Sequence, residues 1–166
     1  MTSMTTRRLV ILRHAKAANP EGAKDIDRPL TDRGHADAAA AGAWLSHQQW
    51  LPDLVVCSTS RRTRETWHGV ALALSGAPEV RYDRDVYAAS GEELLELVTE
   101  VGDEFATMLL IGHNPSVSHL SSILDPVRAD PQGLRTAGFA LHTWDGAWVD
   151  CGPDSAVLTA THTARA

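Results

Sequence analysis

Residues 9–14 read Leu9-Val-Ile-Leu-Arg-His14, four apolar residues that lead directly into an arginine and a histidine. A short apolar run of this kind is typical of a strand buried inside a sheet. The cation and the imidazole then stand at the carboxyl end of that strand, where open α/β sheets place their ligand sites. The stretch therefore predicts a buried strand with a site at its end.

The same arrangement occurs twice more along the chain. The apolar run Leu54–Cys57 is followed by Arg62, and the run Met108–Ile111 is followed by His113. Guanidinium groups make paired, charge-assisted hydrogen bonds to phosphate oxygens, and a neutral imidazole can attack phosphorus. Two arginines and two histidines at three strand ends therefore indicate a pocket for a phosphoryl group.

Strands and helices are expected to alternate along most of the chain. Strands are predicted at Leu9–Leu12, Leu54–Cys57, Val80–Tyr82 and Thr107–Ile111, and helices over residues 31–48, 61–75, 90–101 and 115–124. This pattern predicts an α/β three-layer sandwich with a mostly parallel central sheet. We expect a single domain over residues 7–162, with loose termini at residues 1–6 and 163–166.

The tail of the chain follows a different pattern. Phe139–Trp144, the turn Asp145-Gly146 and Ala147–Asp150 are expected to form an antiparallel edge hairpin, because Asp-Gly suits a tight two-residue turn. The segment Ala156–Ala160 is expected as either a last edge strand or a loose end.

The composition narrows the class of protein. The chain has 166 residues and a net charge of -6, which argues against general affinity for nucleic acid but allows a locally positive pocket. No apolar run approaches the roughly 20 residues that span a bilayer, and no signal peptide is predicted. Cys57 and Cys151 fit no metal-ligand spacing and are expected as reduced thiols in a cytoplasmic protein. Phosphate-loop and dinucleotide-binding motifs are absent from the sequence, so neither a cofactor nor a metal is expected.

Other interpretations remain open at the level of single residues. A histidine that follows a strand is most often a loop residue, and Arg61, Arg62 and Arg64 could form a solvated helix face. A module that binds a phosphorylated ligand without turnover would also need the arginines. It would not need His14, which favours an enzyme.

Four segments resemble motifs of the histidine phosphatase superfamily, which includes the phosphoglycerate mutases. The first is Arg13-His14-Ala15, where the family usually has Arg-His-Gly. The others are Arg28-Pro-Leu-Thr31, Ser58-x-x-x-Arg62-Thr63-x-x-Thr66, with Thr63 in place of the usual alanine, and Gly112-His113-Asn114-Pro115. They occur in the family's order between Leu9 and about Leu120.

The resemblance implies a phosphoglycerate mutase-like fold and a metal-independent catalytic core. In that core Arg13, His14, Arg62 and His113 are catalytic, with His14 as the nucleophile, and Arg13, Arg62 and His113 bind phosphate. Arg28 is a further candidate for phosphate binding. The spacing of the third motif selects Arg62, and leaves Arg61 at the surface.

The branch of the family is inferred from the length of the chain. A short chain without a helical cap is similar to the SixA-type phosphohistidine phosphatases. The resemblance then implies a phosphohistidine-bearing protein as substrate and inorganic phosphate as product, with no nucleic acid or membrane partner. The alternatives are a small-molecule phosphomonoesterase, less favourably a mutase, or a phospho-ligand binding module.

A general acid is not evident from the sequence. Five acidic residues lie in the relevant regions, and each is expected to be a solvated charge: Asp25, Asp27, Asp85, Glu92 and Glu93. A phosphoramidate leaving group can be protonated on its own nitrogen, so a strong enzymic acid is dispensable for phosphohistidine.

Overall fold

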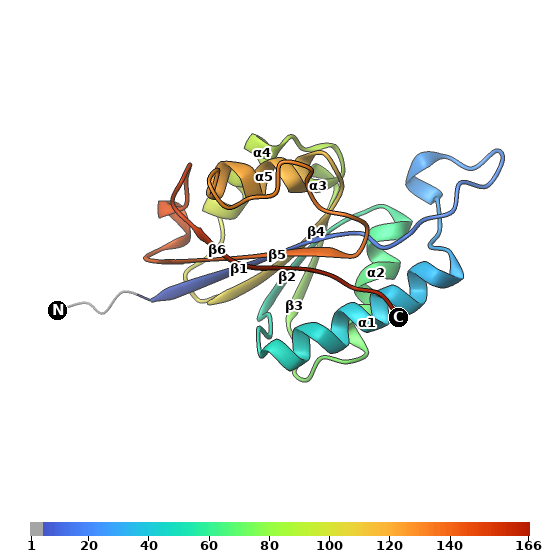
Figure 1. The fold of residues 1–166 in the computed structure, drawn as a ribbon, viewed down its shortest axis with the longest axis horizontal. Coiled ribbons are helices and arrows are strands. Elements are labelled where there is room, and N and C mark those ends of the chain that lie inside the picture. The colour runs from blue at the N-terminus through green and yellow to red at the C-terminus, as the bar shows by residue number, and fades with distance from the viewer. Residues whose placement is uncertain (1–4) are drawn as a thin grey trace.

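A computed structural model describes residues 5–166, which form one six-stranded sheet with the strand order β3-β2-β4-β1-β5-β6 (Figure 1). Strands β1 to β4 pair in parallel, and β5 and β6 pair antiparallel at one side. The strands are β1 (Thr6–Arg13), β2 (Leu54–Ser58), β3 (Glu79–Asp83), β4 (Thr107–Gly112), β5 (Gly138–Asp145) and β6 (Val157–Thr163). The helices are α1 (Asp32–Gln48), α2 (Arg61–Ala71), α3 (Arg84–Ala88), α4 (Gly91–Thr99) and α5 (Ser116–Leu124), with short 3-10 helices η1 (Asp25–Asp27) and η2 (Trp148–Asp150).

Helices cover both faces of the sheet, α1 and α2 on one side and α3, α4 and α5 on the other (Figure 1). The burial of strand β1 on both faces explains why its sequence is continuously apolar. Leu9 and Ile11 pack into the core beneath α4 and α5, while Val10 and Leu12 pack into the core beneath α1 and α2. Both faces of the strand are buried, as expected for a parallel sheet between two helical layers. The predicted three-layer α/β architecture is confirmed.

Strands β2, β4 and β1 are neighbours and run in the same direction, so their carboxyl ends meet at one edge of the sheet. In the register of the sheet Arg13 pairs with Gly112, and Cys57 pairs with Ile111. The residues that follow each strand therefore lie side by side. This topology brings the three predicted strand ends together.

The helix starts follow the expected capping chemistry. The Thr31 hydroxyl accepts a hydrogen bond from the Gly34 amide and caps α1, as its sequence predicts. Ser60 caps α2, and Ser90 and Glu93 form a reciprocal capping box at the start of α4. Helix α2 ends at Ala71, earlier than predicted, and helix α3 was not predicted at all.

The predicted Asp-Gly hairpin is wrong in its second strand. Strand β5 pairs with β6, and the segment Ala147–Asp150 contributes η2 instead of a strand. The physical reason is the burial of Trp148, which is 0% exposed and whose Nε1–H donates to the Phe105 carbonyl. Its ring meets the Trp144 ring edge-on at 5.1 Å, a contact within the core. The antiparallel edge is present, but it is built from the later segment that was left open as a strand or a loose end.

The predicted loose end at residues 163–166 is also corrected. Thr163 belongs to β6, and the Ala164 amide donates to the Ala137 carbonyl. The Ala166 amide donates to Asp37 Oδ1 on α1. At the other end β1 already includes Thr6, whereas the prediction for residues 1–4 lies outside the described residues.

Within residues 5–166, no helix combines the length and hydropathy that a membrane crossing requires.

Candidate active site

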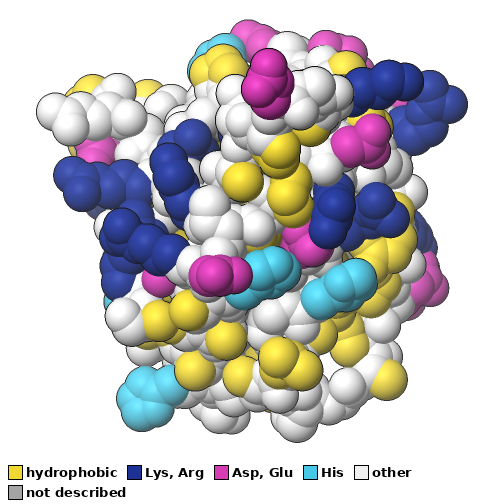
Figure 2. Space-filling view, turned by 90° about the vertical axis from the view of Figure 1, so that its right-hand side faces the viewer, with side chains coloured by type: hydrophobic (Ala, Val, Ile, Leu, Met, Phe, Trp, Pro, Cys, Tyr) yellow, Lys and Arg dark blue, Asp and Glu magenta, His cyan; other side chains and the backbone are white. Residues whose placement is uncertain are grey.

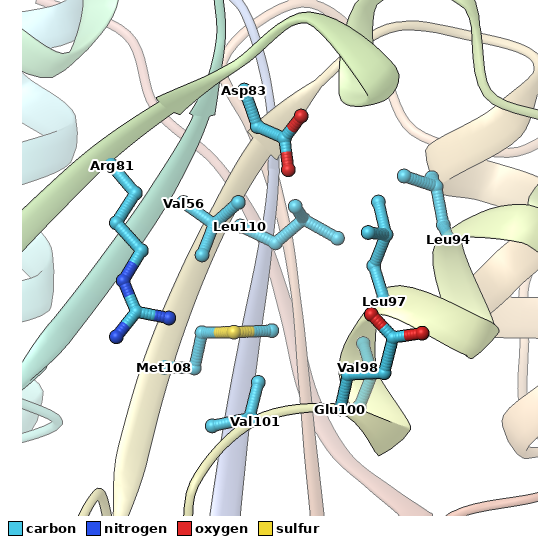
Figure 3. Close-up of a pocket in the computed structure, with 10 residues that line it drawn as sticks. All are labelled: Val56, Arg81, Asp83, Leu94, Leu97, Val98, Glu100, Val101, Met108 and Leu110. Carbon is cyan, nitrogen blue, oxygen red and sulfur yellow. The ribbon is translucent and has the colours of Figure 1, made fainter.

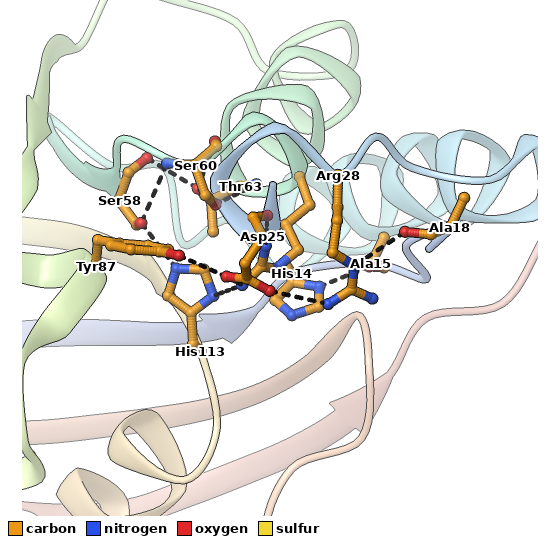
Figure 4. Close-up of polar contacts among 11 residues, drawn as sticks. His14, Ala15, Ala18, Asp25, Arg28, Ser58, Ser60, Thr63, Tyr87 and His113 are labelled. Atoms are coloured by element: carbon orange, nitrogen blue, oxygen red, sulfur yellow. Dashed lines mark hydrogen bonds and ion pairs between the residues drawn. The ribbon is translucent and has the colours of Figure 1, made fainter. Parts of the chain in front are cut away.

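Three of the four predicted core residues meet at the carboxyl edge of the sheet. His14 follows β1, His113 follows β4, and Arg62 lies in the first turn of α2. The two imidazole rings lie near each other (Figure 4), with 5.4 Å between their centroids. Arg62 Nη2 lies 3.3 Å from His113 Nδ1. All three residues are between 6% and 8% exposed. Arg13, the fourth, is half-buried beside His14 and donates from Nη1 to the Leu134 carbonyl at 3.1 Å.

The hydrogen bonds of His14 fix its tautomer. Its Nδ1 lies 2.7 Å from the Ala15 carbonyl oxygen. A carbonyl can only accept, so Nδ1 carries the proton and Nε2 keeps its lone pair. The Ala15 amide in turn donates to Thr66 Oγ1 on α2, which ties the segment after β1 to the helix that carries Arg62. His14 is therefore held with one specific nitrogen available as a nucleophile.

Burial and positive charge keep His14 neutral. Burial is the main cause that lowers the pKa of His14 to about 4, and the guanidinium charges of Arg62, Arg13 and Arg28 lower it further. The hydrogen bond to Ala15 opposes this shift. Near neutral pH the imidazole is therefore unprotonated.

His113 has the opposite tautomer. Arg62 Nη2 can only donate, so Nδ1 of His113 accepts, and the proton is on Nε2, which donates to Ser58 Oγ at 2.7 Å. Burial, followed by the charge of Arg62, lowers the pKa of His113 to about 3. Both rings are thus neutral in a pocket lined by cations.

Arg62 makes most of its contacts with one residue of the loop after β1. Its Nη1 donates to the Asp25 carbonyl at 2.7 Å and its Nη2 donates to Asp25 Oδ2 at 3.0 Å. The buried Nε atoms of Arg62 and Arg13 have no hydrogen-bond partner within residues 5–166. Arg61 points to solvent and pairs with Glu65, as the spacing of the motif predicts.

Asp25 is the one acidic candidate that reaches the site. Its carboxylate also accepts from Tyr87 Oη at 2.5 Å and from Arg28 Nη1 at 3.3 Å, so that Asp25 lies between these two residues (Figure 4). The Tyr87 hydrogen bond is the main cause that lowers the pKa of Asp25 to about 2. The carboxylate is therefore ionised and cannot act as an acid in this arrangement. Arg28 reaches the site through Asp25 and also donates from Nε to the Ala18 carbonyl, and its part in phosphate binding stays a prediction.

The other four acidic candidates lie elsewhere. Asp27 is exposed at the end of η1, and Asp85 is exposed in the first turn of α3. Glu93 forms the capping box of α4, and Glu92 Oε1 lies 3.7 Å from His119 Nε2. Their positions are those of solvated or capping charges, as expected.

Two residues of the site were missed by sequence reasoning. Ser58 was considered, with Ser60, only as a cap of the following helix; Ser60 is the cap, and the buried Ser58 hydroxyl orients His113. Tyr87 lies on α3 and contacts the ring of His113 edge-on, with centroids 5.5 Å apart. Helix α3 directly follows β3, a parallel neighbour of β2 that was predicted at Val80–Tyr82. Applying the strand-end argument to this fourth strand would have placed residues 84–88 at the same edge.

The molecular surface shows the charge arrangement of this side. Figure 2 views the molecule from the right-hand side of Figure 1, where the loop after β1 lies, and shows lysine and arginine side chains on both flanks with histidine and acidic side chains between them.

A separate cavity of about 150 Å³ lies between the sheet and α4. Most of its lining residues are apolar, and the charged residues Arg81, Asp83 and Glu100 are among the rest (Figure 3). It contains none of the predicted site residues.

Comparison with known proteins identifies the family. Residues 9–88 match the family model of the histidine phosphatase superfamily, branch 1. An uncharacterized protein of Mycobacterium tuberculosis is 36% identical over 164 residues, which cover 93% of this chain and 100% of that protein. Among solved structures, a protein of Nakamurella multipartitia assigned as a phosphohistidine phosphatase SixA is 32% identical, with a TM-score of 0.85 over 99% of this chain and 100% of that one. The protein assigned as SixA from Agrobacterium tumefaciens is 28% identical, with a TM-score of 0.81 over 94% of this chain and 97% of that one. The chain belongs to the histidine phosphatase superfamily, and its fold is that of the SixA-like members.

Proposed function

We propose that the protein is a metal-independent phosphatase that forms a phosphohistidine on His14, and that its substrate is phosphohistidine on another protein. One observation carries the proposal: His14 is neutral with its Nε2 lone pair free, and it lies close enough to Arg62, Arg13 and Arg28 for their positive charges to lower its pKa. A neutral nucleophile surrounded by cations suits attack on a phosphoryl group, whose negative oxygens repel other nucleophiles.

The proposed reaction has two steps. In the first, Nε2 of His14 attacks phosphorus, the bond from phosphorus to the leaving atom breaks, and the leaving atom takes a proton. In the second, the oxygen of a water molecule bonds to phosphorus and the nitrogen–phosphorus bond breaks. Both hydrogens of the water leave with inorganic phosphate, which exchanges one of them with solvent. His14 then has its lone pair again, and the arginines neutralise the oxygens in both steps.

His113 assists by a hydrogen bond in this proposal. An incoming phosphoryl dianion raises the pKa of the ring, because a nearby opposite charge favours the protonated form. Nδ1, which accepts from Arg62 in the structure, then takes up a proton and donates to a phosphoryl oxygen. Ser58 keeps the ring in place from the other nitrogen.

The state of Asp25 favours phosphohistidine over an ester. An alkoxide leaving group needs an acid, and the carboxylate nearest to the site is ionised with a pKa of about 2. An imidazole leaving group can take its proton from solvent. The likeness to proteins assigned as SixA supports the same substrate.

A small-molecule phosphomonoesterase is the alternative enzyme. A phospho-ligand binding module is the alternative that is not an enzyme. The ionised state of Asp25, the acidic candidate that contacts Arg62 among the residues described, favours it, because this carboxylate has no proton to give to a leaving group. We place the protein in the cytoplasm, which the two free, buried cysteines support.

A substrate panel tests the proposal. Phosphohistidine peptide, phosphoserine peptide, an aryl phosphate and a sugar phosphate are compared at equal concentration, with and without a chelator. We expect turnover to be fastest for phosphohistidine and unaffected by the chelator. Phosphate binding without turnover of any substrate would favour the binding module, and loss of activity in chelator would refute a metal-independent reaction.

A further inference from the structure

A groove adjoins the candidate phosphoryl site and takes no part in the two proposed reaction steps. It is a cavity of about 320 Å³ lined by the end of α3, the start of α4 and the start of α5, with Tyr87, Ala88, Gly91, His113, Pro115 and His119 among its walls. We infer that this groove binds the leaving group of the substrate and selects a flat ring directly attached to the phosphoryl group or joined to it through one oxygen. The inference rests on the proposed phosphatase function.

His113 links the groove to the phosphoryl site. The residue lines the groove, and its Nδ1 also contacts Arg62. Tyr87 belongs to both places as well, because its hydroxyl donates to Asp25 while its ring lies edge-on to His113. A group attached to a phosphorus atom between His14 and Arg62 therefore has the groove next to it.

The His119 ring forms one wall of the groove and packs on Gly91. A Cβ at Gly91 would lie 2.7 Å from His119 Nδ1, so any side chain at Gly91 would displace the ring. His119 Nε2 also lies 3.7 Å from Glu92 Oε1.

The chemistry of the walls selects the ligand. Ala88, Ala89, Gly91 and Pro115 offer no side-chain hydrogen-bond donor or acceptor. The polar side chains of the lining are already engaged: Tyr87, Asn114 and Ser116 donate to Asp25, Leu134 and His113, and Ser90 accepts from Glu93. A sugar would bring several hydroxyl groups against this lining, which is costly, whereas a flat ring presents mostly apolar surface with at most one further polar ring atom. Phosphorylated histidine and tyrosine side chains share such a ring, and phosphoserine lacks it.

Binding of non-hydrolysable phosphonates tests the groove without requiring turnover. Methylphosphonate carries the phosphoryl group alone, phenylphosphonate adds a flat ring, and 2,3-dihydroxypropylphosphonate adds hydroxyl groups. In the wild type we expect phenylphosphonate to bind about tenfold more tightly than the other two, measured by calorimetry.

Ala88→Leu is the test variant, because Ala88 is exposed at the end of α3 and a larger side chain there fills the groove. We expect it to remove the preference for the ring and leave methylphosphonate binding unchanged. Ala36→Leu, at an exposed position of α1, is the matched control and should retain the preference.

The outcomes separate the two proposals. The inference that the groove binds the leaving group is overturned if the wild type binds all three phosphonates equally, or if Ala88→Leu keeps the preference for the ring. Neither result affects the phosphoryl site. Failure of methylphosphonate and phenylphosphonate alike to bind overturns the site itself, and the groove with it. In turnover, a preference for phosphohistidine or phosphotyrosine peptide over phosphoserine peptide supports the groove and identifies the ring, whereas equal rates contradict it.

Discussion

Two adjacent arginines on α2 show how one position in a helix changes the role of a side chain. The Arg62 side chain is 8% exposed and directed at His113, whereas the Arg61 side chain is 52% exposed and pairs with Glu65. A charge that is buried beside a histidine and a carboxylate can act on a ligand with little screening by water. The same group in solvent contributes little. The chain therefore offers a matched pair of arginines for testing the site.

Arg62→Ala should lower kcat/KM about 100- to 1,000-fold. By analogy with the loss of one oxyanion donor, the change removes about 2.7–4 kcal/mol of transition-state stabilisation. Steady-state kinetics on the preferred substrate measures the effect. Arg61→Ala is the control and should remain within a factor of two or so of the wild type; equal losses in both variants would contradict the assignment.

Asp25→Asn should tighten the binding of inorganic phosphate about two- to fivefold. The Asp25 carboxylate competes with phosphate for Arg62 and Arg28, and an ion pair that is half-exposed is worth about 0.2–1 kcal/mol. Isothermal titration measures the dissociation constant. Asp27→Asn removes the same charge from η1 without a contact to Arg62, and serves as the control. Weaker phosphate binding in Asp25→Asn would show that the carboxylate does not compete.

At the scale of elements, the strand ends carried the predictive signal. The apolar runs at Leu9–Leu12, Leu54–Cys57 and Thr107–Ile111 are buried strands, because a parallel sheet between two helical layers needs apolar residues on both faces. Polar residues directly after such runs could therefore be placed at one edge. The sequence also supported the α1 cap at Thr31, since capping depends on local residues.

The errors arose where distant contacts override local signals. The Asp-Gly turn predicts a hairpin locally, but burial of Trp148 against Phe105 redirects the chain into η2. Strand β3 was predicted, but the helix α3 that follows it and carries Tyr87 was missed, because five residues are too few to show a helical period. The pairing of Asp25 with Arg62 spans 37 residues and has no local signature.

Gly42→Ala should lower the free energy of unfolding by at least about 1 kcal/mol. Helices α1 and α2 approach so closely that a Cβ at Gly42 would lie 2.3 Å from the Val70 carbonyl oxygen. Overpacking of this kind costs about 1–3 kcal/mol and outweighs the gain in helix propensity. Urea denaturation provides the measurement. Gly152→Ala, where a Cβ meets no atom within 4 Å, is the control and should change the free energy of unfolding little. If Gly42→Ala also left the free energy of unfolding unchanged, helices α1 and α2 would be able to move apart without cost.

For the whole molecule, the site is a source of instability in acid. The folded state holds His14 and His113 neutral, with pKa values of about 4 and about 3, whereas the unfolded chain has histidines near their ordinary value of 6.5. Between those values the unfolded state binds more protons, so stability decreases as the pH falls. Each unit of pKa shift corresponds to about 1.4 kcal/mol.

The free energy of unfolding should therefore be highest above pH 6.5 and should fall steadily from there toward pH 4. Urea denaturation at pH 7.5, 6.0 and 5.0 measures the slope. The double variant with His14→Asn and His113→Asn removes both titrating groups and should have a shallower slope over the same range. A wild-type stability that is constant from pH 7.5 to 5.0 would contradict the neutral state of the two rings.

The most direct test asks where the phosphoryl group goes during turnover. The protein is mixed with substrate carrying a labelled phosphoryl group, quenched in alkali within a single turnover, digested and mapped by mass spectrometry. We predict an acid-labile label on the imidazole of His14, and neither label nor turnover in His14→Ala. Label on another residue, or full turnover by His14→Ala, would contradict the account.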